Sequence, residues 1–318
     1  MKTQWRLWCV ALGILVAVSR MAVASEATNA FNEGTKLYRA GKFKEAIAAY
    51  DRAIRAAPTA AEPYNNRGLA YHKLGQNEAA IKNYDEAIKL DPKLTDAYFN
   101  RGNAYYDLKQ NDQAIKDYSE AIKLEPKLRD AYYKRGDAYF VQKQYESAIK
   151  DYDEVVKRGP KSSLVLRQRG LAYSESGQFE KAIQDFDQAQ KLNSKDSEIY
   201  YSRGLVYRRL GKFDQAVRDY TEAIRLNPKN AESYNNRANA YSLLGKYENA
   251  LKDYDQALKL EPKNARIYAN RGAVKLRLGK TDDGTKDLHK AMEIDPALKD
   301  KIEPLLGASR PSPSKSEQ

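Results

Sequence analysis

Apolar and small side chains recur along the chain at the helical spacings of three and four residues. Between residues 61 and 92 two such faces follow one another, the first made by Tyr64, Gly68 and Tyr71 and the second by Ala80, Tyr84 and Ala87. Gly75 separates the two faces. Pro92 ends the second, because proline lacks an amide donor and restricts the residue before it. The pattern predicts two short helices joined by a turn, which is a helix hairpin.

The hairpin pattern repeats every thirty-four residues. An arginine marks the period at Arg67, Arg101, Arg135, Arg169, Arg203, Arg237 and Arg271. Eight repeats can be aligned on it without insertions, starting at residues 27, 61, 95, 129, 163, 197, 231 and 265. A period kept this strictly predicts an all-α solenoid over residues 25–298, in which each hairpin buries its apolar face against its neighbours.

The recurring residues resemble the signature of the tetratricopeptide repeat family, and the resemblance covers nearly all of the chain after residue 25. The matching positions of the second repeat are Tyr64, Arg67-Gly68, Tyr71, Ala80, Tyr84, Ala87 and Pro92. The resemblance implies a right-handed superhelical solenoid of eight helix-turn-helix repeats whose first helices line a concave groove. Leu166 and Ser194 depart from the pattern in the fifth repeat, so we expect a looser junction between repeats five and six.

The repeating arginine has a candidate partner sixteen residues later in the chain. The pairs include Arg101 with Asp117, Arg135 with Asp151, and Arg203 with Asp219. The first repeat lacks both members, since it has Glu33 and Ala49 at these positions. Joint presence and joint absence favour a structural ladder of arginine–aspartate pairs between packed helices over a ligand site.

Function is expected at positions that vary between repeats on the groove side of the first helices. The sixth position of five repeats is an asparagine: Asn32, Asn66, Asn100, Asn236 and Asn270. An amide offers both a donor and an acceptor, which suits the backbone of an extended peptide. The alternative is that these amides only meet water in an open groove.

Repeats three and four carry the richest set of candidate binding residues on this side. Its aromatic members are Phe99, Tyr106, Tyr133 and Phe140, and its polar members include Asn100, Asn103 and Asp137. Rigid rings among polar groups are typical of binding hot spots. The alternative is that some of these rings pack between helices.

The charged side chains on the same side change sign along the chain. Repeats two to four sum to −3, from Glu62, Asp96, Asp107, Asp130 and Asp137 against Lys73 and Lys134. Repeats five to eight sum to +2, from Arg167, Arg208, Arg209, Arg266 and Arg277 against Glu175, Glu198 and Glu232. Such a field would orient a partner with one basic and one acidic end.

Similar repeats that clamp carboxy-terminal chaperone tails use a set of lysine, arginine and asparagine residues. No three consecutive repeats reproduce that set here, so we reject a clamp of this kind.

The first 24 residues have the three parts of a secretory signal peptide. Lys2 and Arg6 form a basic start, residues 7–18 are an apolar run, and Ala22-Val23-Ala24 is a small-residue cleavage site. A membrane anchor is the alternative, but it needs about twenty apolar residues, and Arg20 follows the run closely. We expect cleavage before Ser25, no membrane span afterwards, and a periplasmic or secreted protein of a bacterial envelope.

Composition argues against a catalytic chain. Cleavage would remove Cys9, and it would lower the net charge from +12 to +9 because three cations and no acids leave with it. No disulfide, thiolate metal site or cysteine nucleophile then remains. His72 and His289 are the only histidines, and neither lies in a metal or nucleophile motif. We expect no catalysis, no metal and no cofactor.

A pI near 9.3 is typical of nucleic-acid-binding domains, but the lysines and arginines are interleaved with acidic residues in every repeat. We exclude nucleic acid and predict a non-catalytic scaffold that binds an extended segment of another protein. The alternative is a glycan-binding scaffold for polysaccharide export or cell-wall assembly.

At the end of the chain we expect a short capping segment over residues 299–306 and a disordered tail over residues 307–318. Nothing in the sequence indicates an oligomeric state.

Overall fold

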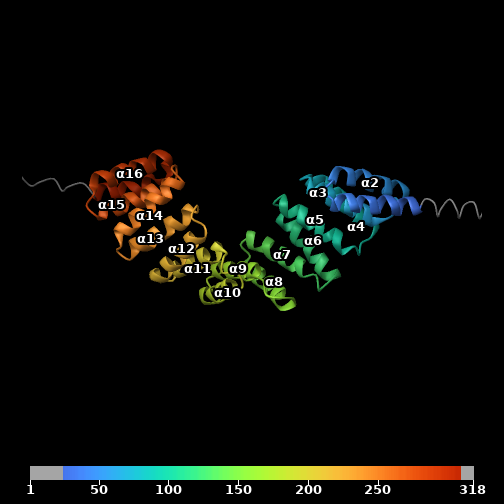
Figure 1. The fold of residues 1–318 in the computed structure, drawn as a ribbon, viewed down its shortest axis with the longest axis horizontal. Helices are drawn as coiled ribbons and strands as arrows, with labels where there is room; N and C mark the ends of the chain where they lie inside the picture. The colour runs from blue at the N-terminus through green and yellow to red at the C-terminus, as the bar shows by residue number, and fades with distance from the viewer. Residues whose placement is uncertain (1–23, 309–318) are drawn as a thin grey trace, which may run out of the picture. The chain divides into compact units, whose positions relative to one another are not determined.

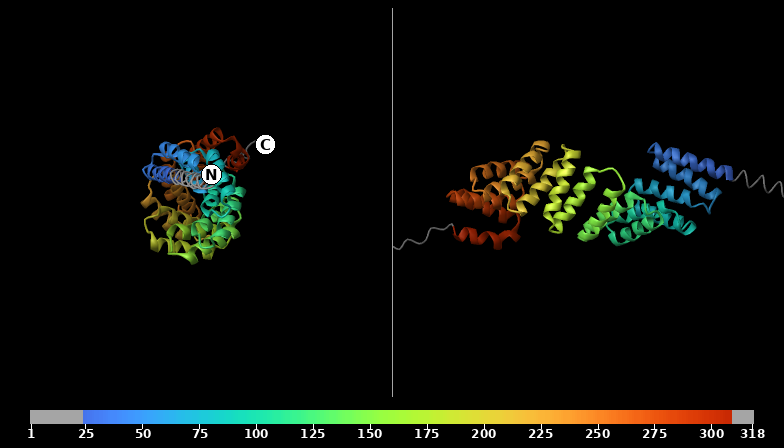
Figure 2. Two further views of the ribbon diagram at one scale, coloured as in Figure 1. Left: turned by 90° about the vertical axis from the view of Figure 1, so that its right-hand side faces the viewer. Right: turned by 90° about the horizontal axis from the view of Figure 1, so that it is seen from below.

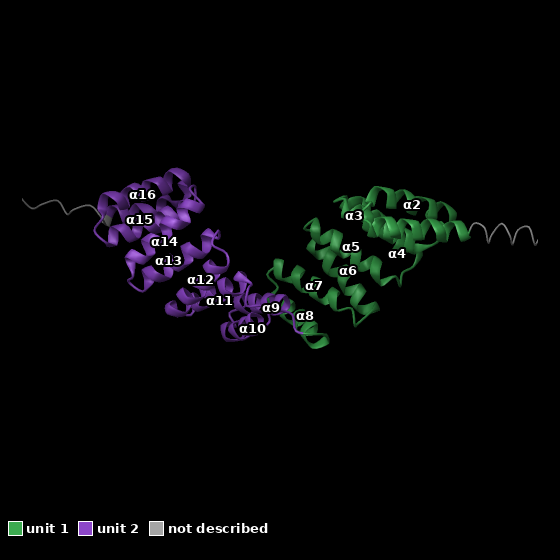
Figure 3. Cartoon of the chain, viewed as in Figure 1, with its two compact units in different colours: residues 1–160 green, residues 161–318 purple. Residues whose placement is uncertain are grey.

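The computed structural model describes residues 24–308, and every regular element in that range is a helix (Figure 1). The chain divides into two compact units, residues 1–160 and 161–318 (Figure 3). In each unit the helices follow one another as hairpins in chain order (Figure 1, Figure 2). The all-α class and the repeated hairpin are therefore confirmed over the described part of the chain. The predicted signal peptide lies outside the described residues, except for Ala24.

The N-terminal unit contains the first four repeats. Residues 24–39 are helical and form a hairpin with α2 (Phe43–Ala56). The next hairpins are α3 (Ala61–Lys73) with α4 (Asn77–Leu90), α5 (Thr95–Asp107) with α6 (Asn111–Leu124), and α7 (Arg129–Val141) with α8 (Tyr145–Arg158). The first helices of repeats two to four begin at the residues where the sequence places the repeat starts.

The C-terminal unit contains the other four repeats and a C-terminal extension. Its hairpins are α9 (Ser163–Glu175) with α10 (Phe179–Leu192), α11 (Ser197–Arg209) with α12 (Phe213–Leu226), α13 (Ala231–Leu243) with α14 (Tyr247–Leu260), and α15 (Ala265–Arg277) with α16 (Thr281–Ile294). A short 3₁₀ helix, η1 (Pro296–Leu298), and α17 (Lys299–Ala308) follow.

The hairpin turns require one residue with a left-handed backbone just after the first helix. Six turns place glycine there, as at Gly75 with φ of 73°, since glycine adopts positive φ without a Cβ penalty. The turns after α5 and α7 instead use Lys109, with φ of 63°, and Lys143, with φ of 61°. These two lysines hold a conformation that costs an ordinary residue about 1–2 kcal/mol.

Small residues in the first helices allow the two helices of a hairpin to approach each other closely. A Cβ added to Gly102 would lie 2.8 Å from the ring of Tyr118, which is fully buried on α6. Ala114, Tyr118 and the next repeat's Ala138 form one buried cluster, so the same ring also joins repeats three and four. Each repeat therefore completes its core with its neighbour.

The division between the compact units falls after Pro160, between repeats four and five. The expected looser junction between repeats five and six is not where the chain divides. At the junction of repeats five and six, Tyr200 on α11 donates a hydrogen bond to the Ser194 carbonyl at 3.2 Å, so the serine that replaces proline keeps a contact with α11.

The last helix of repeat four ends differently from those of repeats two and three. Arg158 ends α8 where α4 and α6 end in leucine, and its guanidinium lies 4.8 Å from the centre of the Tyr132 ring.

The C-terminal extension covers the last repeat. Ile302 on α17 is 2% exposed and packs with Leu288 and Ala291 of α16. The helix runs through Pro304 to Ala308, so it is two residues longer than the expected capping segment. Pro304 does not interrupt it, although its missing amide removes one helical hydrogen bond. The rest of the expected tail, residues 309–318, lies outside the described residues.

Candidate functional site

The repeating arginines form bidentate pairs with buried aspartates of the same hairpin. Arg101 donates from Nε and Nη2 to the two carboxylate oxygens of Asp117, each at 2.7 Å. The same two-bond pairing joins Arg135 to Asp151, Arg169 to Asp185, Arg203 to Asp219, Arg237 to Asp253, and Arg271 to Asp287. Burial raises the pKa of Asp117, although the hydrogen bonds from Arg101 lower it. The guanidinium and carboxylate groups of these pairs are therefore bonded to each other inside the fold.

Arginines of this ladder also reach back to the second helix of the preceding repeat. Arg101 donates from Nη1 to Asp85 on α4, and Arg203 donates to Asp187 on α10. In other repeats the acceptor is a hydroxyl, as for Arg135 with Ser119 at 2.9 Å. The arginine therefore joins three helices and two repeats. This second partner was not predicted from the sequence, although acidic residues sixteen positions before the arginine carry the signal.

The first two repeats depart from the ladder. Glu33, which replaces the arginine, pairs with Arg52 at the surface. Arg67 donates to Asn83 in its own hairpin and to Asp51 on α2. Arg67 therefore keeps a carboxylate partner, although this partner belongs to the preceding repeat.

The sixth-position asparagines form hydrogen bonds between neighbouring first helices. Asn100 donates to Asn65 at 3.1 Å, Asn270 donates to Asn235 at 3.3 Å, and Asn236 donates to the Tyr201 hydroxyl at 3.1 Å. Asn66 accepts a bond from Asn65 at 3.2 Å, and Asn32 is exposed. Within each unit the fifth and sixth positions therefore form a row of side chains, which we call the amide row of that unit. The fifth-position members Asn65, Tyr201 and Asn235 were not singled out from the sequence.

For three aromatic candidates of repeats three and four, the structure has the packing contacts that the alternative interpretation expected, and the rings are half-buried. The ring of Phe99 lies 5.9 Å from that of Tyr118, and the ring of Tyr133 lies 6.0 Å from that of Tyr152. Phe140 makes an edge contact with Tyr145 of α8 at 5.5 Å. All three rings therefore pack against the second helix of their own hairpin: Phe99 and Tyr133, at the fifth position of their repeats, contact the buried tyrosine, and Phe140, at the twelfth, contacts the first residue of α8.

Tyr106 differs from the other rings of this set, since it lies next to charged groups. The ammonium of Lys109 is 5.9 Å from its ring centre. Burial raises the pKa of Tyr106, and the carboxylates of Asp137 and Asp107 raise it further. Tyr106 is half-buried and, like Phe99, packs against the cluster of Ala114, Tyr118 and Ala138.

Asn103 and Asp137 hold buried tyrosine hydroxyls. Tyr118 donates to Asn103 at 2.9 Å, and Tyr152 donates to Asp137 at 2.7 Å. In repeat two the equivalent ninth position is Leu69, and the buried hydroxyl of Tyr84 has no hydrogen-bond partner among residues 24–308. The ninth position therefore serves the scaffold as well as the surface.

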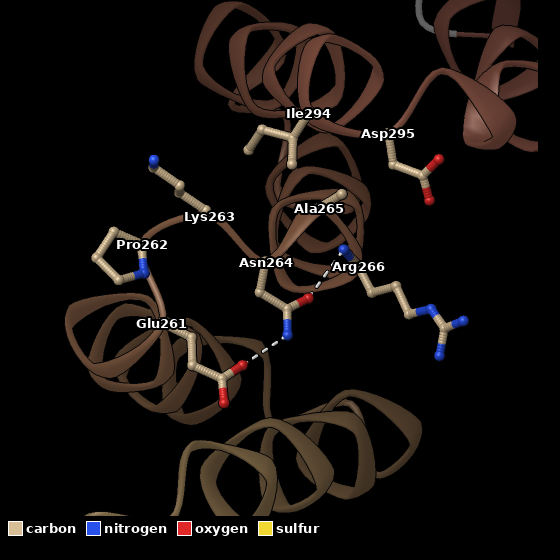
Figure 4. A pocket seen from close by; sticks show the side chains of 8 residues that line it. All are labelled: Glu261, Pro262, Lys263, Asn264, Ala265, Arg266, Ile294 and Asp295. Carbon is tan, nitrogen blue, oxygen red and sulfur yellow. Dashed lines mark hydrogen bonds between the residues drawn. The ribbon is translucent and has the colours of Figure 1, made fainter.

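Two hollows lie near the end of the C-terminal unit. The first, of about 710 Å³, lies between the α14–α15 loop and the end of α16 (Figure 4). Asn264 there donates to Glu261 at 2.7 Å and accepts from the Arg266 amide at 3.1 Å, so its polar groups cap α15. The second, of about 410 Å³, is lined by residues of α13, α15, η1 and α17, including Asn235, Asn239 and Asn270. It lies on the amide row.

Two kinds of feature are absent from the described part of the chain. No group of three or more histidine, cysteine, aspartate or glutamate side chains between residues 24 and 308 is placed to hold a metal ion. Over the same range, no helix combines the length and the apolar character that crossing a membrane requires.

Two family models match the repeats of this chain. Models of the TPR repeat match residues 34–75, 70–109, 102–142, 170–211 and 204–245. Models of the tetratricopeptide repeat match residues 130–162 and 231–264. These matches together cover more than half of the chain. No protein of the curated set matches the sequence.

Solved structures share the fold. The C-terminal part of a TPR repeat-containing protein from Cytophaga hutchinsonii has a TM-score of 0.64 at 18% identity, covering 76% of this chain and 98% of that one. A chain of the APC/C hetero-tetramer Cut9–Hcn1 has a TM-score of 0.58 at 17% identity over 85% of this chain, which spans only 53% of that one. MamA protein has a TM-score of 0.50 at 28% identity, covering 54% of this chain and 94% of that one.

Proposed function

The chain belongs to the tetratricopeptide repeat family, whose members serve as scaffolds that bind other proteins and peptides, and we propose that it is a non-catalytic adaptor of the cell envelope. Its ligand is an extended segment of a partner protein, bound along the amide row of the first helices. Three observations support the binding mode: the row itself, its hollow in the C-terminal unit, and the engagement of the arginine ladder inside the fold.

The amide row carries this proposal. Each bond between Asn100 and Asn65, or between Asn270 and Asn235, uses one amide hydrogen and one carbonyl oxygen. The other hydrogen of each donor amide is left for a ligand. Fixing the amides in this way reduces the entropy that binding must otherwise overcome. Such a row of oriented donors and acceptors suits a peptide backbone, and each bond would contribute about 0.5–1.5 kcal/mol net.

A glycan ligand is less well supported. Stacking on sugar faces is strongest on exposed rings, whereas Phe99 and Tyr133 are half-buried and make tilted contacts with the buried tyrosines of their hairpins. Backbone recognition needs only amides and carbonyls, which the row provides. Peptide is therefore the ligand class that these contacts favour.

The test is a pull-down from a bacterial envelope extract with the full chain and with two variants. The groove variant removes side chains of the row and one half-buried ring of the predicted set: Asn66→Ala, Asn100→Ala, Tyr106→Ala and Asn270→Ala. The control variant removes four lysines of second helices: Lys82→Ala, Lys116→Ala, Lys150→Ala and Lys252→Ala. Circular dichroism verifies that both variants fold.

A protein that the unaltered chain and the control capture, and that the groove variant loses, is the expected result. Equal capture by all three would exclude the row as the binding surface. Release of the captured material by soluble glycans, but not by peptides, would favour the polysaccharide scaffold instead.

A further inference from the structure

The hollow on the amide row in the C-terminal unit gathers hydrogen-bond donors and positive charge around an apolar floor. Three asparagines line it, together with Arg266 of α15 and Lys301 of α17. Leu305, which is 39% exposed, contributes part of the apolar surface. Within residues 24–308, no carboxylate side chain lines this hollow.

Arg266 occupies a position that is unfavourable for a cation. It is the second residue of α15, where the positive end of the helix dipole favours an acidic side chain. The equivalent residue is glutamate or aspartate in five other repeats, at Glu62, Asp96, Asp130, Glu198 and Glu232. Its side chain points away from Glu261 (Figure 4), and it forms no ion pair within the described range. Arg266 also lines the first hollow with Glu261 and Asp295, but it is not ion-paired with either, so its charge remains for a ligand.

Lys301 adds a second positive charge from outside the repeats. Its side chain is exposed and, like that of Arg266, lacks an ion-pair partner among residues 24–308. Its helix is anchored by Ile302, which is 2% exposed, so the ammonium is carried by a fixed element.

The asparagines of the hollow are oriented to present their NH₂ groups. The Oδ1 of Asn239 accepts from the buried Tyr254 hydroxyl at 2.6 Å, and the Oδ1 of Asn235 accepts from Asn270 at 3.3 Å. Each of these oxygens already accepts one bond, and neither NH₂ group of Asn235 and Asn239 is needed for these two bonds, so the amides can offer donors to a ligand. Two cations and two oriented donors together call for an acceptor with negative charge.

We propose that this hollow binds the side-chain carboxylate of an acidic extended segment, with an adjacent apolar side chain on the floor beside Leu305. The inference rests on the proposed peptide-binding function and adds the chemistry of the partner at one end of the C-terminal unit. The apolar floor favours a carboxylate attached to a peptide over a hydrated free anion. The set differs from the clamp for carboxy-terminal tails, because one cation comes from α17 and the other from the first turn of α15.

The test measures fluorescence anisotropy of a labelled peptide with a Leu-Glu-Leu-Glu core and Gly-Ser flanks, blocked at both ends. A matched peptide has glutamine in place of glutamate, and another has a free carboxyl terminus. The variants are Arg266→Gln with Lys301→Gln, and Asn239→Asp, which keeps an acceptor for Tyr254 but repels a carboxylate. The control is Lys252→Gln with Lys259→Gln on α14, which removes the same charge outside the hollow.

The glutamate peptide should bind the unaltered chain and the control. Both hollow variants should weaken it about tenfold or more, because one removes both cations of the hollow and the other adds a negative charge. The glutamine peptide should bind the unaltered chain as weakly as the glutamate peptide binds the hollow variants. A free carboxyl terminus should leave the affinity of the glutamate peptide unchanged. Equal binding of the glutamate and glutamine peptides, equal loss in the control, or binding only through a free terminus would overturn the inference. The adaptor function would survive that failure if the groove variant still lost its partner in the pull-down.

Discussion

Arg101 and Arg135 occupy the same place in neighbouring repeats but contact different numbers of carboxylates. Arg101 has Asp117 in its own hairpin and Asp85 in the preceding repeat. Arg135 has Asp151 and, in the preceding repeat, the Ser119 hydroxyl. A half-buried guanidinium without a carboxylate is costly, so the two aspartates should differ in what they contribute to stability.

We expect Asp151→Asn to lower the free energy of unfolding by about 2 kcal/mol, because hydrogen bonds to charged groups are worth about 1.5–3 kcal/mol. Asp117→Asn should cost below about 1 kcal/mol, since Asp85 still neutralises Arg101. Repeat two already tolerates asparagine at this position, where Arg67 keeps Asp51. Urea unfolding followed by circular dichroism measures both. Equal losses would show that the second carboxylate does not compensate.

Buried tyrosine hydroxyls offer a second comparison between repeats. The hydroxyl of Tyr84 is buried without a partner among residues 24–308, whereas that of Tyr254 donates to Asn239. Tyr84→Phe should leave stability unchanged or raise it by up to about 1 kcal/mol, and Tyr254→Phe should lower it by about 1 kcal/mol. Repeat five already combines Leu171 with Phe186. Thermal unfolding of the two variants checks this, and destabilisation by Tyr84→Phe would mean that its hydroxyl has a partner.

Contacts whose spacing repeats along the chain can be predicted from the sequence. Contacts that depend on the direction of a side chain cannot. The sixteen-residue spacing places Asp117 opposite Arg101, and the structure has this pair. The same spacing read backwards would have found Asp85. That Phe99 turns toward Tyr118 depends on the angle between two helices, and no periodicity reports that angle. The hollow beside Lys301 depends on where α17 docks, which the repeat pattern does not cover.

Among the elements, the turns after α5 and α7 depart from the pattern of the other hairpins. Lys109 and Lys143 adopt positive φ where other turns have glycine. We expect Lys109→Gly and Lys143→Gly each to raise the free energy of unfolding by about 1 kcal/mol, since glycine avoids the left-handed penalty. The reverse change, Gly75→Ala, should destabilise by a similar amount. Urea unfolding measures these changes, and a loss of stability in Lys109→Gly would indicate that its contact with the Tyr106 ring outweighs the backbone strain.

For the molecule as a whole, the proposed envelope location depends on the first 24 residues, and export can be tested directly. When the full chain is expressed in a bacterium, we expect the periplasmic or secreted fraction to contain a protein whose amino-terminal sequence begins at Ser25. Signal peptidases require small residues before the bond that they cleave, so Ala22→Leu with Ala24→Leu should leave the longer chain associated with the membrane fraction. Ala27→Leu, just beyond the cleavage site, is the control and should be processed normally. A full-length chain with Met1 in the cytoplasmic fraction of the unaltered protein would contradict export and, with it, the search for partners in the envelope.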